Sequence, residues 1–221
     1  MKRITDILKQ DWYILLMILA SFVLGAYFYP RLPARVPIHW DSAGHVNGYG
    51  SRFTGAFVTP LTNLGLYIVF LIVPAIDPRS KNYEKFRGSY QIIKCLLVAM
   101  LLVMQTCALL TATGVRININ IVTGIAVSVL FILFGNVMGR FRHNYFVGIK
   151  TPWALANEDV WRKTHRLAGP LWVLGGIANL ILTLLGNRFE AVGLIIIIVI
   201  IVVIPYAYSY LVFRKIKHGE Q

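Results

Sequence analysis

The chain has 221 residues, of which 57% are hydrophobic and only 14% are charged, and its mean hydropathy is +0.65. This composition excludes an ordinary soluble domain and predicts an integral membrane protein. The formal net charge of +13 is explained by anionic lipid headgroups as partners, so no direct nucleic-acid partner is inferred.

Six apolar runs are long enough to cross a bilayer as helices, which takes about 20 residues. In chain order they are Trp12 to Tyr29, Ala56 to Ile76, Gln91 to Thr113, Ile119 to Gly139, Ala168 to Gly186 and Ala191 to Phe213. The first follows basic residues, as a signal peptide would, but it ends without a small-residue cleavage site. It is therefore expected to be retained as a helix.

The basic residues are distributed unequally between the two sides of such a bundle. With the N-terminus inside, 17 of the 22 Lys and Arg residues lie in or beside cytoplasmic segments. The outer segments contain only Arg31, Arg35, Arg52, Arg116 and Arg188. Because basic residues stay on the cytoplasmic side, both termini are expected to be cytoplasmic, in a multi-pass protein of the cell (inner) membrane.

The outer segment from Pro30 to Gly55 forms the first polar region. Its prolines at 30, 33 and 37 favour extended backbone. Gly44 and the turn-forming pair Asn47-Gly48 then predict a compact, hairpin-like loop over the outer face.

The cytoplasmic segment from Asp77 to Arg87 is short and basic. It contains no catalytic motif, and Tyr83 and Phe86 are expected to face the membrane. The last two spans are joined by a short turn over residues 187–190, which predicts adjacent antiparallel helices. Gly135 and Gly139 have the GxxxG spacing, and together with Gly175 and Gly176 they are expected to pack helices within the bundle.

The second polar region lies between the fourth and fifth spans and is more elaborate than a connector requires. Thr151-Pro152 predicts a helix start, with Thr as the cap and Pro at the first helical position. A second start is expected at Asn157, followed by Glu158 and Asp159 paired with Arg162 and Lys163 at four-residue spacing.

From Asn157 onward the pattern predicts an amphipathic helix that runs into the fifth span. Its apolar stripe contains Val160, Trp161, Thr164, Leu167 and Ala168. One interpretation is that this helix only rests on the inner membrane surface and is anchored there by its aromatic side chains. The other gives His165 a role as a hydrogen-bonding or pH-responsive group beside Trp161, its neighbour four positions earlier.

Few residues suggest catalysis or metal binding. The sequence has no nucleophile, zinc-protease or phosphate-loop motif. Cys95 and Cys107 lie twelve positions apart in one predicted helix, which excludes a disulfide between them. His143 and His165 with Glu158 or Asp159 lack a close-spaced pair of the usual metal ligands. His39, Asp41 and His45 in the outer loop are slightly more suggestive of a metal site, because three ligands fall within seven residues on a turn. We expect no metal, no cofactor and no enzymatic activity.

The two polar regions together resemble a known family. Gly148-Ile149-Lys150-Thr151-Pro152-Trp153, with Val160 to Gly169, resembles the signature of the SdpI family of bacterial membrane proteins. The outer segment Leu32-Pro33 to Trp40, with Gly44, Gly48 and Tyr49, is similar to the domain of unknown function that commonly precedes it. Lys150 stands where the family usually has Arg, and Asp41 and His45 where it has Asn and an acidic residue.

The resemblance implies an immunity and signalling protein that gives resistance to a secreted peptide toxin and recruits a cytoplasmic transcriptional repressor. The expected fold class is an all-α integral membrane protein, a six-transmembrane-helix bundle with a short amphipathic cytoplasmic helix and a compact extracytoplasmic loop. Its expected domains are residues 1–80, a two-helix unit with the outer loop, and residues 81–221, a four-helix unit with a signature loop at 140–169.

Candidate residues fall into two sets, neither of them catalytic. The cytoplasmic set, for partner binding or relay, is Asn144, Gly148, Thr151, Pro152, Trp153, Trp161, Thr164, His165, Arg166 and Gly169. The extracytoplasmic set is Pro37, His39, Trp40, Gly44, Gly48 and Tyr49.

Two alternatives stay open. One is a small transporter or a membrane enzyme acting on lipid or peptide, which predicts a water-lined cavity holding Gln105, Asn136 and Asn179. Against it, the predicted spans place no acidic or basic residue deep in the membrane. The other is a structural membrane protein without a dedicated ligand.

Overall fold

Six helices in the described part of the chain are long and apolar enough to cross a membrane. A computed structural model describes residues 4–186 and 190–219, so the predictions for Lys2, Arg3, Arg188 and most of the turn at 187–190 lie outside the described residues. The six spans are Trp12–Arg31, Arg52–Ile76, Ser80–Ala112, Ile119–Met138, Glu158–Leu185 and Glu190–Lys217. All six predicted spans, and the all-α fold class, are confirmed.

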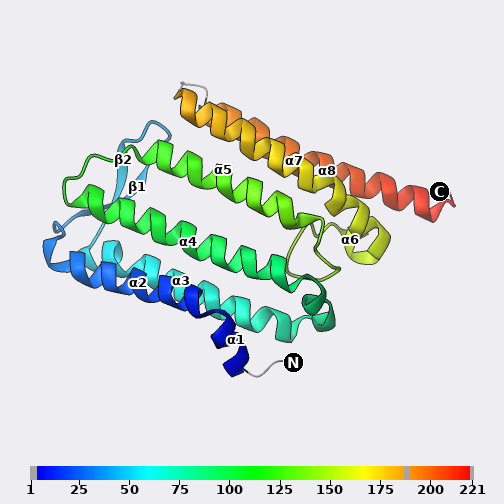
Figure 1. Cartoon of the computed structure of the whole chain (residues 1–221). Helices are drawn as coiled ribbons and strands as arrows, with labels where there is room; N and C mark the ends of the chain where they lie inside the picture. The colour runs from blue at the N-terminus through cyan, green and yellow to red at the C-terminus, as the bar shows by residue number, and fades with distance from the viewer. Residues whose placement is uncertain (1–3, 187–189, 220–221) are drawn as a thin grey trace. The chain divides into compact units, whose positions relative to one another are not determined.

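The elements follow one another in a simple order (Figure 1). The helices and 3-10 helices are α1 (Ile4–Gln10), α2 (Trp12–Phe28), η1 (Tyr29–Arg31), α3 (Arg52–Ile76), η2 (Ser80–Phe86), α4 (Arg87–Ala112), α5 (Ile119–Met138), α6 (Pro152–Ala156), α7 (Glu158–Leu185) and α8 (Glu190–Lys217). The strands β1 (Val36–Trp40) and β2 (Val46–Gly50) lie between η1 and α3.

The chain divides into two compact units, each formed from segments that are separated in the sequence. The first contains residues 1–70 and 94–123, and the second contains residues 71–93 and 124–221. The helices α3, α4 and α5 therefore each contribute to both units. The division into domains at residue 80 stays a prediction.

The first unit has an apolar core near the strands. Leu32, Val36, Ala56 and Leu109 are each at most 2% exposed and form one cluster. Val36 belongs to β1, so the start of the hairpin is packed into the helices of this unit. The start of the hairpin is thus held in place by the burial of Val36 as well as by its strand pairing.

The hairpin was predicted, and of its two expected turn signals Gly44 lies in the turn but Asn47-Gly48 does not. β1 pairs antiparallel with β2, with Val36 opposite Gly50 and Trp40 opposite Val46. The chain reverses over Asp41 to His45, where Gly44 has a φ of +84°. The expected turn at Asn47-Gly48 is wrong, because both residues lie within β2 and the Asp41 side chain organises the reversal instead.

The second unit is built around close helix contacts. α7 and α8 run side by side, as Figure 1 shows. A Cβ on Gly135 would come within 2.7 Å of the Gly169 carbonyl oxygen, and one on Gly176 within 2.8 Å of the Ser128 carbonyl oxygen. These glycines allow α5 and α7 to approach closely, as expected. Gly139 has no such neighbour, so the GxxxG spacing overstates its role.

Candidate functional site

The segment between α5 and α6 is folded around the side chain of Asn144. This residue is fully buried, and its Oδ1 accepts hydrogen bonds from the backbone N–H groups of Phe146 and Val147 at 2.9 and 2.6 Å. Its Nδ2 donates to the carbonyl oxygens of Arg142 and Val147 at 2.8 and 2.9 Å. Both donors and the acceptor of the amide are thus occupied, and Asn144 fixes the backbone that leads to Gly148.

A buried carboxylate that was not predicted attaches this segment to the 77–87 connection. Asp77 is 3% exposed and accepts from the Tyr145 backbone N–H at 2.9 Å, the Tyr83 hydroxyl at 2.9 Å and the Arg79 backbone N–H at 2.7 Å. Asn82 adds a bond from its Nδ2 to the His143 carbonyl oxygen at 2.8 Å. No local pattern indicates this role, because a single Asp before a Pro has no distinctive spacing.

The expectation that Tyr83 and Phe86 face the membrane is wrong. Both are buried, at 6% and 3% exposure. Phe86 packs against Phe141, with 5.9 Å between ring centroids, and Tyr83 is held by its bond to Asp77. The segment folds inward because its polar groups find partners in the 140–147 loop.

The buried centre of the site is the pair Trp161 and His165 on α7. Both are 1% exposed, and their rings stack with centroids 4.1 Å apart. The Trp161 Nε1–H donates to the Phe141 carbonyl oxygen at 3.0 Å. Trp161 is therefore bound inside the protein, and the interpretation that it anchors the helix at the membrane surface is wrong.

The hydrogen bonds of His165 define its tautomer. The Ile149 backbone N–H donates to Nε2 at 2.9 Å, so Nε2 must carry a lone pair. Nδ1 lies 2.8 Å from the Trp161 carbonyl oxygen, which can only accept, so Nδ1 carries the proton. His165 is neutral in this geometry and joins α7 to the polar loop.

Gly148 allows this close approach. Its φ is +118°, a backbone conformation that residues with a Cβ rarely adopt. A Cβ there would overlap His165 Nε2 and come within 3.2 Å of the Trp161 ring. The structure thus brings three of the predicted residues, Gly148, Trp161 and His165, into one contact group, which we call the loop–helix cluster.

The predicted helix starts are confirmed. The Thr151 Oγ1 accepts from the Ala154 backbone N–H at 3.1 Å, and Asn157 Oδ1 accepts from Asp159 and Val160 at 2.8 and 3.1 Å. Thr151 Oγ1 also accepts from the Ser209 hydroxyl of α8 at 2.9 Å. Each cap begins its helix, and Thr151 in addition ties α6 to α8.

The remaining predicted residues of the cytoplasmic set lie outside the loop–helix cluster. Trp153 packs against Tyr206 and Tyr210 of α8, with centroids 5.3 and 5.0 Å apart. Gly169 lies against α5, and Thr164 is fully buried. Pro152 and Arg166 are exposed.

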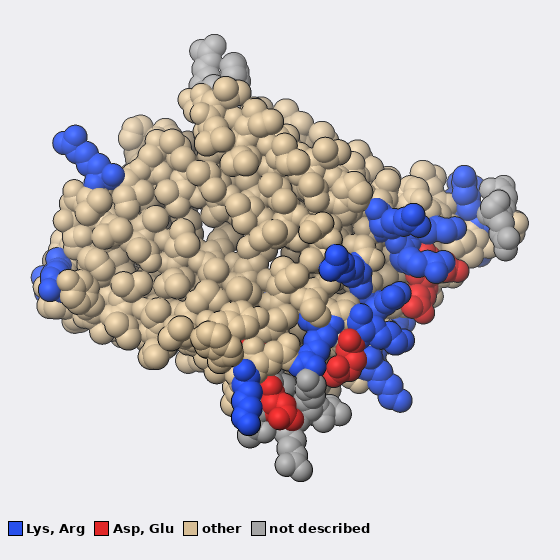
Figure 2. All heavy atoms as spheres, in the orientation of Figure 1, with Lys and Arg blue, Asp and Glu red and all other residues tan. Residues whose placement is uncertain are grey.

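The charged side of α7 is exposed, as its pattern predicted. Asp159 forms an ion pair with Arg162 at 2.8 Å, which is a three-residue spacing; the expected four-residue pairs are not formed in the described residues. Figure 2 shows Lys and Arg side chains gathered at the end of the second unit that bears α6 and the last turns of α8. This basic end matches the composition expected of a cytoplasmic membrane boundary.

A pocket of about 440 Å³ opens beside the loop–helix cluster. It is lined by Gly139, Phe141, Arg142, His143, Asn157, Glu158, Asp159, Trp161 and Arg162. His143 is 5% exposed, and its Nε2 lies 3.1 Å from the Leu155 carbonyl oxygen. Burial lowers the pKa of His143, and the nearby Arg79 charge lowers it further.

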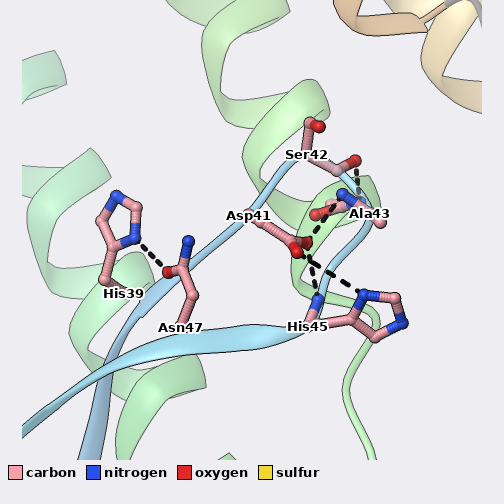
Figure 3. Close-up of polar contacts among 7 residues, drawn as sticks. His39, Asp41, Ser42, Ala43, His45 and Asn47 are labelled. Atoms are coloured by element: carbon pink, nitrogen blue, oxygen red, sulfur yellow. Dashed lines mark hydrogen bonds and ion pairs between the residues drawn. The ribbon is translucent and has the colours of Figure 1, made fainter.

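The outer set of candidate residues forms the hairpin. His39 Nδ1 bonds to Asn47 Oδ1 at 2.5 Å, whereas His45 Nδ1 lies 3.5 Å from Asp41 (Figure 3). The Asp41 carboxylate also accepts from the backbone N–H groups of Ala43 and His45 at 2.9 Å, and these bonds lower its pKa. The two histidines therefore engage different partners.

The other outer candidates shape the same hairpin. A Cβ on Gly48 would lie 2.8 Å from that of His39, so glycine permits the pairing of the strands there. Pro37 pairs with Tyr49, which is 50% exposed, and Trp40 ends β1. Asn120 Nδ2 donates to the Ser42 carbonyl oxygen at 2.8 Å and ties the hairpin tip to α5.

Of the polar residues invoked for a transporter, Gln105 is hydrogen-bonded and Asn136 is exposed, whereas Asn179 is bonded only through Nδ2, because its buried Oδ1 has no hydrogen-bond partner within the described residues. Gln105 Nε2 donates to the Ser21 and Ala56 carbonyl oxygens at 3.0 and 3.3 Å. Asn179 Nδ2 donates to the Gly124 carbonyl oxygen and the Ser128 hydroxyl, and Asn136 is exposed. Within the described residues, no group of three or more His, Cys, Asp or Glu side chains could hold a metal ion.

Fold and site together define a multi-pass α-helical membrane protein with a buried cluster that joins the loop after its fourth span to the beginning of its fifth span. Residues 140–209 match the SdpI/YfhL protein family, and residues 16–64 match the domain of unknown function DUF1648. The chain is also 24% identical to "Immunity protein SdpI" of Bacillus subtilis (strain 168) over 209 residues, which cover 95% of this chain and 98% of that protein. The resemblance to the SdpI family is confirmed. No solved structure matches this chain.

Proposed function

We propose that this chain is a non-enzymatic membrane immunity protein that protects its cell from a secreted peptide toxin. The observation that carries the proposal is the similarity to Immunity protein SdpI along nearly the whole length of both chains. It is supported by the position of the loop–helix cluster, which lies inside the region that matches the SdpI/YfhL family. The contacts of this cluster explain why its residue types are needed for the fold of the loop.

The loop–helix cluster is proposed to act as a relay on the cytoplasmic side. α7 begins at Glu158, contributes Trp161 and His165 to the cluster, and continues as one helix, with Pro170 inside it, to Leu185. A rearrangement of the 144–151 loop would therefore be transmitted directly to a membrane-spanning helix. The adjacent 440 Å³ pocket, with charges of both signs, is the surface proposed to meet a cytoplasmic repressor protein.

The hairpin is proposed to face the toxin on the opposite side of the membrane. Ile38, Tyr49 and Phe53 expose 43%, 50% and 55% of their surfaces, which offers apolar contacts to a peptide. This assignment requires both termini to be cytoplasmic. Single cysteines at Ser42 and at Lys163, in a background lacking Cys95 and Cys107, test it with a membrane-impermeant thiol reagent: Ser42→Cys should react from outside and Lys163→Cys only after permeabilisation.

The functional test is complementation. The chain would be expressed in Bacillus subtilis lacking its own immunity protein SdpI, and these cells would be grown with the toxin-producing parent strain. Survival comparable to that of cells with their own SdpI is expected. If these cells died although the protein was present in their membrane at normal levels, the proposed function against this toxin would be contradicted.

A further inference from the structure

The pocket beside the loop–helix cluster lies between the chain just after α5 and the start of α7. Two of the residues that line it, His143 and Trp161, are 5% and 1% exposed. The Trp161 Nε1–H donates to the Phe141 carbonyl oxygen at 3.0 Å. His143 Nε2 lies 3.1 Å from the Leu155 carbonyl oxygen, which can only accept, so Nε2 carries the proton of the neutral ring. The ring N–H groups of both residues are therefore used within the protein.

The buried wall of the pocket offers an acceptor instead. With its proton on Nε2, His143 has a lone pair on Nδ1, and no N–H or O–H group of the described residues donates to that atom. Nδ1 is not enclosed either, so it can be reached from the pocket that His143 lines. Burial and the Arg79 charge lower the pKa of His143, which keeps the ring neutral at cytoplasmic pH.

The charges around the pocket add a second acceptor. Glu158 lines the pocket, and its carboxylate forms no ion pair within residues 4–186 and 190–219. Arg162 and Asp159 neutralise each other at 2.8 Å. A cation, which has only donors, thus finds both Glu158 and the buried Nδ1, whereas an anion finds only the exposed Arg142. The pocket therefore favours an ammonium or a guanidinium group.

The surface around the pocket is strongly basic. Residues 139–166 contain six Lys and Arg residues but only two acidic ones, and both acidic residues line the pocket. Figure 2 shows Lys and Arg side chains gathered at this end of the second unit. Such a surface repels small free cations and attracts an acidic protein surface. The cation that enters the pocket is therefore expected to be a side chain of an otherwise acidic partner.

We propose that the pocket binds one lysine or arginine side chain presented by an acidic surface of a cytoplasmic protein. The cationic group donates to the Glu158 carboxylate and to His143 Nδ1, and acidic residues beside it contact Arg142. This inference rests on the proposed function, which assigns the pocket to a cytoplasmic repressor protein. It adds the charge pattern that the partner must carry.

A pair of synthetic peptides tests this charge pattern on the whole protein in phosphatidylcholine nanodiscs. In both peptides glutamates flank the central residue, which is arginine in one and citrulline, its uncharged isostere, in the other. Fluorescence anisotropy measures their binding. The arginine peptide should bind about tenfold more tightly, as expected for hydrogen bonds to a charged group, although it carries less negative charge. Equal binding of the two peptides would overturn the proposal.

Two variants locate the preference for arginine in the pocket. Glu158→Gln removes the carboxylate, and Gly139→Leu fills the pocket at a position where a Cβ meets no atom within 4 Å. Each should bind the two peptides equally. Glu84→Gln and Gly88→Leu are matched changes at residues that do not line the pocket, and they should keep the preference. A preference that persists in either pocket variant would contradict the assigned site.

Free arginine amide is the control for a site that takes small cations. If it bound as tightly as the arginine peptide, the pocket would not require an acidic partner and the proposal would be wrong. The complementation assay is a separate measurement. Protection of the cells together with equal peptide binding would reject only the charge pattern, whereas failed protection together with a clear preference for arginine would reject only the immunity function.

Discussion

The Ile149 backbone N–H donates to His165 Nε2 at 2.9 Å, and this bond joins the polar loop to a helix that continues across the membrane. This hydrogen bond requires a neutral imidazole that carries its proton on Nδ1. The Nδ1–H group donates to the Trp161 carbonyl oxygen. A loop 16 positions earlier in the chain is thereby closed onto α7.

Replacing Gly148 by alanine should destabilise the protein by about 1–3 kcal/mol, because the φ of +118° becomes strained and the new Cβ overlaps His165. The measurement is the thermal unfolding temperature in detergent, which should fall by several degrees. Gly88→Ala is the matched control, since a Cβ there meets no atom within 4 Å. Equal melting temperatures for the two variants would show that the contact with His165 is unimportant.

Replacing Asp77 by alanine should cost about 2–4 kcal/mol, because donors from Tyr145, Tyr83 and Arg79 lose their acceptor in a buried place. Thermal unfolding again measures the effect. Asp159→Ala is the comparison: its ion pair with Arg162 is exposed on both sides and should be worth less than about 1 kcal/mol. A loss at Asp77 no larger than that at Asp159 would contradict an anchoring role for Asp77.

Acidification should weaken the protein through His143. Burial and the Arg79 charge lower its pKa in the folded state from the ordinary value of 6.5, so the unfolded chain binds a proton more readily. This contribution to stability is present above pH 6.5 and is lost as the pH falls below it. Melting temperatures between pH 7.5 and pH 5 should fall less steeply for His143→Gln than for the wild type, whereas the exposed His218→Gln should leave the slope unchanged. If the melting temperature depended on pH equally in the wild type and in His143→Gln, the proposed contribution of His143 to acid sensitivity would be contradicted.

Local patterns predicted the helices well. Long apolar runs defined all six spans, and Thr151-Pro152 and Asn157 marked helix starts because caps depend on residues that are neighbours in sequence. Gly148 and the Trp161–His165 spacing were also visible, since residues four apart meet on a helix. These features need no knowledge of distant contacts.

The wrong or missing predictions concern residues whose positions depend on partners distant in the sequence or on competing local hydrogen bonds. Tyr83 and Phe86 looked like lipid-facing aromatics, but Asp77 and Phe141 bury them. Asn47-Gly48 is a strong turn pair, yet the Asp41 side chain captures two backbone N–H groups and places the reversal earlier. Asp77 and Ser209 were missed because their partners are 68 and 58 positions away.

The central proposal, that the loop–helix cluster is the cytoplasmic working part of an immunity protein, is tested most directly by His165 in the complementation assay. At equal membrane protein levels, His165→Ala should lose most of the protection given by the wild type, and His165→Gln, which keeps an acceptor, should restore part of it. The exposed His218→Ala is the control and should protect fully. Full protection by a folded His165→Ala protein would contradict the proposal.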